Sequence, residues 1–99
     1  MIRDVLVEEL DRNERAQEAY VEQCRSLPNG SVSVRTRGNK AYCYLKYRVG
    51  ERVVTDYVGP SELVEEDLRK KVNQRKELES ILKRLKREHK FIEKALRHA

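Results

Sequence analysis

The chain has 99 residues, of which 39% are charged and 38% hydrophobic, and its formal net charge at pH 7 is +5. This length accommodates one small domain, and the high charge is typical of long helices rather than of a large apolar core. No segment is apolar enough for a signal peptide or a membrane span, so we expect a cytoplasmic protein with no membrane association.

The charge is unevenly distributed along the chain. Residues 1–30 carry four Arg against seven acidic residues, for a net −3, whereas residues 31–60 and 61–99 carry +4 each. An acidic first third beside a basic remainder predicts that the first helix pairs with the last one, or that the basic part attracts a polyanion.

The first predicted element is a helix over residues 4–27. Asp4 is placed to cap it, and apolar residues then recur at a spacing of three to four, interrupted by Asn13 and Gln17. The Pro-Asn-Gly sequence at residues 28–30 predicts the end of the helix.

A period of two then predicts three strands, over residues 31–37, 40–49 and 52–58. The two-residue loops Gly38-Asn39 and Gly50-Glu51 both begin with Gly, which suits tight primed hairpin turns. Each turn gives its own register, and both registers place the same apolar residues on one face of a three-stranded antiparallel meander. These residues are Val32, Val34, Ala41, Cys43, Leu45, Val54 and Val58.

The register set by the second turn leads to two specific predictions about the apolar face of the meander. It pairs Cys43 with Val58, at the far end of the hairpin. It also places Asp56 beside Leu45 as a misfit, so we expect Asp56 to lie near a sheet edge or to meet an Arg or Lys from a helix.

One helix is predicted over residues 61–97, because Ser61 suits its N-terminus and no Gly or Pro follows. The alternative is a bend near Asn73 that divides it into two helices.

A strict 4-3 repeat runs along this segment and is continuously apolar only from Leu78 onward, apart from His89. This seam has three candidate partners: the first helix, the same helix of a second copy, or another protein. The interface candidates are Leu78, Leu82, Leu85, His89, Ile92 and Leu96. Together the elements predict a single α+β domain.

The other face of the predicted sheet collects basic and tyrosine side chains. Basic groups contact phosphates, tyrosines stack on bases, and a sheet can enter a major groove, so this face is a candidate contact for DNA or RNA. The alternative is an ordinary solvated sheet face. The basic run at residues 83–90 is a second cationic feature, with the same two interpretations. The candidates on the sheet are Arg35, Arg37, Lys40, Tyr42, Tyr44, Lys46, Arg48 and Tyr57.

The sequence contains no pattern that indicates catalysis or metal binding. Cys24 and Cys43 lack metal-ligand spacing and are too few for a secreted disulfide framework, so we expect buried free thiols. His89 and His98 have no second ligand at a suitable spacing, and the glycines form no phosphate-binding loop. We therefore expect no enzymatic activity, no metal, no cofactor and no small-molecule substrate.

The second hairpin, Tyr42–Gly59, follows the pattern YxYLxYRxGxxxxxxYxG. It resembles a pattern in small, mostly uncharacterised prokaryotic proteins with a charged helical tail, and it is also similar to a hairpin near the start of some transposases. The resemblance implies a mobile-element or nucleic-acid context, although a shared hairpin does not transfer activity, and the catalytic carboxylates of transposases have no counterpart here. We expect a non-catalytic nucleic-acid-binding accessory protein or, alternatively, a homo-oligomeric structural or protein-interaction module assembled through the last helix.

Overall fold

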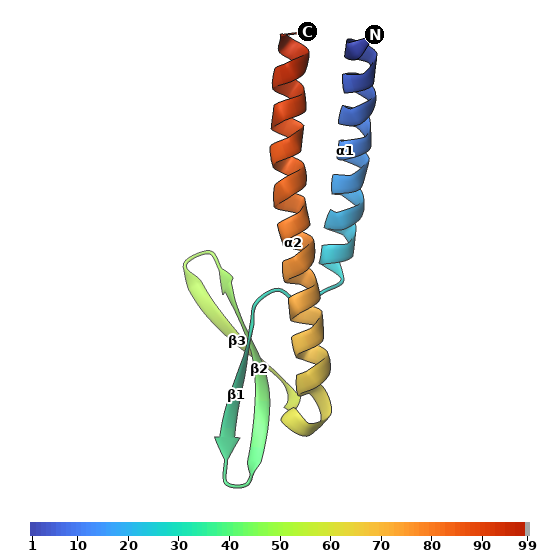
Figure 1. Ribbon diagram of the computed structural model, residues 1–99. Coiled ribbons are helices and arrows are strands. Elements are labelled where there is room, and N and C mark those ends of the chain that lie inside the picture. Colours follow the sequence, from blue (N-terminus) through green and yellow to red (C-terminus); the bar gives the residue numbers. More distant parts are fainter. Residues whose placement is uncertain (99) are drawn as a thin grey trace. The chain divides into compact units, whose positions relative to one another are not determined.

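The computed structural model describes residues 1–98 as two helices and a three-stranded antiparallel sheet (Figure 1). The predicted α+β class and element order are confirmed, and the last helix is continuous through Asn73. Along residues 1–98, no helix is both long and apolar enough to cross a membrane. In chain order, the elements are α1 (Ile2–Arg25), β1 (Ser31–Arg37), β2 (Lys40–Val49), β3 (Arg52–Pro60) and α2 (Ser61–Arg97).

The chain divides into two compact units. One contains residues 1–26 together with the chain from residue 77 onward, and the other contains residues 27–76. The helix α2 therefore contributes its first half to the unit with the sheet and its second half to the unit with α1. That the whole chain acts as a single domain remains a prediction.

The first unit is an antiparallel pair formed by α1 and the second half of α2 (Figure 1). Its apolar seam includes the buried Leu82 and the half-buried Leu85 and Ile92, and Cys24 is buried on α1. Of the three candidate partners of the seam, the structure places α1 beside it. Pairing of this kind supplies most of the stability of a helix in water, because propensity alone is marginal.

Asn13 is the buried polar residue of this helix pair, with 6% of its surface exposed. Its Nδ2 donates to the Leu85 carbonyl oxygen of α2 at 2.9 Å, and its Oδ1 accepts a hydrogen bond from Nε2 of Gln17 at 2.7 Å. The two residues that interrupt the apolar stripe in the sequence thus form a polar contact. A buried, satisfied Asn of this kind favours one register of a helix pair over others.

The start and end of α1 differ from the prediction. The helix begins at Ile2, its N-cap position is Met1, and no side chain caps it. Asp4 lies inside the first turn, where a carboxylate favours the helix dipole without capping. The helix ends at Arg25, two residues before the predicted end, because the turn toward Pro28 begins at Ser26.

The second unit contains the sheet, in the strand order β1-β2-β3. Both tight turns form as predicted, and all seven pairs between β1 and β2 have the predicted register. Between β2 and β3 the predicted register holds from Val49 opposite Arg52 to Tyr44 opposite Tyr57.

A β-bulge then overturns the predicted pairing of Cys43 with Val58. The register shifts between Cys43 and Tyr44, so Cys43 lies opposite Gly59, and β3 continues to Pro60. Val58 is consequently 40% exposed rather than part of the core. A bulge inserts one unpaired residue into a strand. Counting residue pairs outward from the turn does not reveal such an insertion.

The core of this unit lies between the sheet and the first half of α2. Cys43 is fully buried against Leu68 and Val72, and apolar side chains from β1, β2 and the start of α2 surround them. A Cβ atom added to Gly59 would lie 3.0 Å from Cγ1 of Val64. The bulge therefore brings a residue without a side chain to the place where α2 approaches closely. The surrounding residues are Val32, Leu45 and Val64.

Candidate nucleic-acid interface

The face of the sheet that points away from Cys43 brings together the predicted tyrosines from two strands. Tyr42 and Tyr44 lie on the central strand β2, and the register places Tyr57 of β3 opposite Tyr44. Within residues 27–76, α2 lies over the other face and no element covers this one (Figure 1). Tyr57 is 56% exposed, whereas Tyr42 and Tyr44 are half-buried.

The three tyrosine rings form a tilted cluster. The centroid of the Tyr57 ring lies 5.5 Å from that of Tyr44 and 6.2 Å from that of Tyr42, with interplanar angles of 57° and 56°. Offset, tilted rings at these separations attract each other through their quadrupoles. The cluster therefore holds the rings in place, while Tyr57 keeps a large exposed surface.

Five cations accompany the tyrosines on the same face, and the strands contribute no carboxylate to it. Arg35 lies over the Tyr44 ring, with its Cζ atom 4.8 Å from the centroid, in a cation–π contact. All five are exposed, and none of them takes part in an ion pair within residues 1–98. A phosphate group can therefore approach them without displacing an acidic partner. The five are Arg35, Arg37, Lys40, Lys46 and Arg48.

An open depression of about 280 Å³ lies on this surface. Its lining is Arg37, Tyr42, Tyr44 and Tyr57, so each of the three strands contributes at least one side chain. Lys46 lies outside it, farther along β2 toward the second turn. We call the eight predicted residues of this face, with the depression, the tyrosine–cation face.

A tyrosine–carboxylate pair lies on the opposite face of the sheet, and sequence reasoning missed it. The hydroxyl of Tyr47 donates to Oδ2 of Asp56 at 2.6 Å. Asp56 is the predicted misfit on the apolar face. It lies on the edge strand β3, in agreement with one of the two expectations, and its partner is a diagonal neighbour in the sheet rather than an Arg or Lys from a helix. The signal was present, because Tyr47 and Asp56 share a face in the predicted register.

The hydrogen bond to Asp56 is the largest cause of a pKa of Tyr47 above its ordinary value, and desolvation of the hydroxyl and the negative charge of Asp56 raise this pKa further. The folded state therefore holds this proton more tightly than the unfolded chain does. The resulting stabilisation is complete below the unfolded pKa of about 10 and is lost as the pH rises through the folded pKa. We expect Asp56→Asn to move the Tyr47 titration back toward its ordinary range.

This prediction is checked by NMR titration of the Tyr47 ring in the wild type and in Asp56→Asn. Urea unfolding at several alkaline pH values should show a steeper loss of stability in the wild type. Identical titration curves for the two proteins would contradict the role given to Asp56.

The predicted helix-interface histidine lies between two carboxylates in the helix pair. Nε2 of His89 is 3.0 Å from Oε1 of Glu14 on α1, and Nδ1 is 2.7 Å from Oε1 of Glu93. His89 therefore contacts α1 within the helix pair. Among residues 1–98, no group of three or more His, Cys, Asp and Glu side chains is arranged to hold a metal ion. Both cysteines are buried, and neither is part of a disulfide.

The basic run of α2 lies on the exposed side of the same pair. Lys83, Arg87 and Lys90 are exposed and follow each other at spacings of four and three, which places them on one side of the helix. This surface has cations but no aromatic cluster like that of the sheet. It therefore matches a solvated helix face or a phosphate contact equally well.

The structure thus defines an α+β protein in which a helix pair accompanies a small sheet with one cationic, tyrosine-rich face. Residues 2–70 match the family described as a domain of unknown function, DUF6788, and the chain belongs to this family. The match covers α1, the sheet and the start of α2. It agrees with the predicted resemblance to small uncharacterised proteins. No curated protein and no solved structure gave a significant match.

Proposed function

We propose that this protein is a non-catalytic nucleic-acid-binding protein that uses the tyrosine–cation face of its sheet. The observation that carries the proposal is the composition of that face: five exposed cations and three clustered tyrosines with no carboxylate. Cations supply the sequence-independent attraction to phosphates, and aromatic rings add stacking on bases.

The distribution of acidic residues supports this assignment. Of the chain's 17 acidic residues, only Glu51 and Asp56 lie in residues 31–60, and both are away from the tyrosine–cation face. Glu51 is in the second turn, and Asp56 is bonded to Tyr47 on the opposite face. The resemblance of the second hairpin to one near the start of some transposases is consistent with a nucleic-acid context.

Fluorescence anisotropy with labelled single-stranded and duplex oligonucleotides tests the proposal. We expect binding at roughly 50 mM salt that weakens linearly with the logarithm of the salt concentration. Replacing Arg37, Lys46 and Arg48 together by Gln should weaken binding. It should also reduce the slope of log K against the logarithm of the salt concentration by about 2 to 3 in magnitude, because each lost phosphate contact contributes somewhat less than 1 to that slope.

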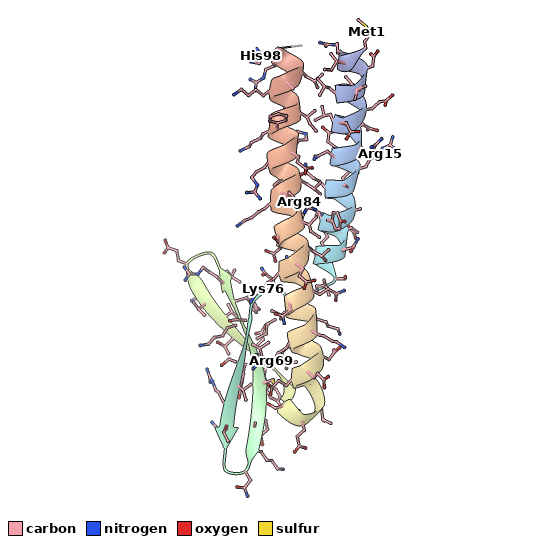
Figure 2. All side chains as sticks on the ribbon, viewed as in Figure 1. Met1, Arg15, Arg69, Lys76, Arg84 and His98 are labelled. Carbon is pink, nitrogen blue, oxygen red and sulfur yellow. The ribbon has the colours of Figure 1, made fainter. Side chains whose placement is uncertain are left out.

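The matched control removes the same charge from the helix pair. Arg3, Arg12 and Arg15 are exposed residues of α1, and Arg15 is labelled in Figure 2. Their joint replacement by Gln should leave the salt slope unchanged, because α1 is not part of the proposed site. Equal losses in the two triple variants would show a general effect of net charge and would contradict the assignment to the sheet.

A third variant, with Lys83, Arg87 and Lys90 replaced by Gln, tests the basic run of α2 as the alternative location. We expect a smaller effect than for the sheet variant, because this surface lacks the tyrosine cluster. The alternative function, a homo-oligomer assembled through the last helix, has no specific support, since the seam residues it would use pack beside α1.

A further inference from the structure

We infer that the tyrosine–cation face takes single-stranded nucleic acid, with one unstacked base held in the depression against Tyr57. This inference rests on the proposed function and narrows it to one class of ligand. It follows from the shape of the ring cluster, the size of the depression and the position of the arginines around it.

Tyr57 offers the ring surface on which a base can stack. More than half of the surface of this residue is exposed, and its ring neighbours Tyr42 and Tyr44 both lie on β2. The rings are tilted by 56° and 57° and together line the depression, so a planar group lying on one ring can meet the edges of the others. Ring edges are positive and favour contact with the negative faces and lone pairs of a base.

The depression is small compared with a typical small-molecule site. Its volume of about 280 Å³ is slightly below that of small-molecule sites, which typically span roughly 300–1,000 Å³. It is also open, so the sugar and phosphate of the bound nucleotide can remain outside, along the strands. The site therefore suits one base of a longer chain rather than a whole enclosed ligand.

The arginines lie where the backbone of such a chain would run. Arg37 lines the depression, and Arg35 is two residues away on the same edge strand, with its guanidinium over the Tyr44 ring. The cation–π contact orders Arg35 beside the aromatic cluster and still leaves its N–H groups free for a phosphate. The rings and the phosphate-binding groups are thus adjacent.

A duplex does not present what this surface recognises. Its base faces are stacked on each other, and only base edges and phosphates are accessible. A depression lined by tyrosine rings gains stacking energy only from bases that are already unstacked, as in single strands, loops and ends. The cations alone would attract a duplex, but the tyrosines would add nothing to that binding.

Anisotropy titrations of the full chain test this inference. They use oligothymidylate and a mixed-sequence duplex at the same salt concentration. We expect the single strand to bind more tightly than the duplex. Tyr57→Ala should weaken single-strand binding by about 5- to 150-fold and change duplex binding by less than about twofold. Tyr57→Phe, which keeps the ring, should retain single-strand affinity within about twofold of the wild type.

Tyrosine fluorescence provides a second, direct signal, because the chain has five Tyr and no Trp. A stacked base should quench it in the wild type and less in Tyr57→Ala. A duplex that binds as tightly as the single strand, with Tyr57→Ala affecting neither, overturns this inference and leaves the proposed function standing. Absence of binding to both oligonucleotides overturns the proposed function itself.

Discussion

Gly30→Ala is expected to destabilise the sheet-containing unit by about 3 kcal/mol or more, the largest effect of any single methyl addition that the structure indicates. Gly30 has a φ of +139°, which L side chains rarely adopt. A Cβ atom built there would lie 2.2 Å from the carbonyl oxygen of Lys46, in the middle of β2. The central strand would have to move, because no flexible side chain is available to yield. Urea unfolding followed by circular dichroism measures the loss.

Gly50→Ala is the matched control for this variant. Gly50 also has a positive φ, of +61°, but a Cβ atom there would meet nothing within 4 Å. Only the left-handed conformation then opposes the substitution, and the expected loss is about 1–2 kcal/mol. If both variants lose the same free energy of unfolding, the close approach of Gly30 to Lys46 does not matter for stability.

Leu68→Ala is expected to lower the free energy of unfolding by about 2–5 kcal/mol. Leu68 is 7% exposed and packs with Val72 of α2 against Cys43 of the sheet. The substitution removes buried methyl groups and leaves a cavity between the helix and the sheet, and the rigid strands close it only in part. Urea unfolding of both proteins measures the difference.

The same substitution at Leu63 shows how much of this effect comes from burial. Leu63 lies five residues earlier in the same helix and is 79% exposed. We expect Leu63→Ala to change stability by less than about 0.5 kcal/mol, because surface substitutions remove few contacts and Ala is a good helix former. Similar losses at Leu63 and Leu68 would indicate that the core described for residues 27–76 is not the one that stabilises the protein.

Most of the sheet was predictable because strand pairing follows simple geometry. Two Gly-first turns and a period of two suffice to place Val32 opposite Leu45 and Tyr44 opposite Tyr57. The prediction was wrong from Cys43 onward, where the bulge brings Gly59 rather than Val58 opposite it. A Cβ atom at Gly59 would lie 3.0 Å from Cγ1 of Val64 in α2, and the pairing rules of a hairpin contain no information about this close approach.

The candidate site was predictable as a set of residues on one face. The alternation of side chains in β1, β2 and β3 is enough to bring Arg35, Tyr44 and Tyr57 to the same side. The stacking of Arg35 on Tyr44, the tilt of the rings and the depression were not predictable, because they depend on side-chain rotamers and on the twist of the sheet.

Sequence alone determined the order of elements and which side of each helix or strand is apolar, since both follow from local periods of 3.6 and 2. The tertiary structure alone decided which surfaces meet. It placed the seam of α2 beside α1, and it made Asn13, an apparent interruption of the stripe, the residue that donates to the Leu85 carbonyl. A polar residue in an apolar stripe is unfavourable until a partner satisfies it, and that partner lies 72 residues away along the chain.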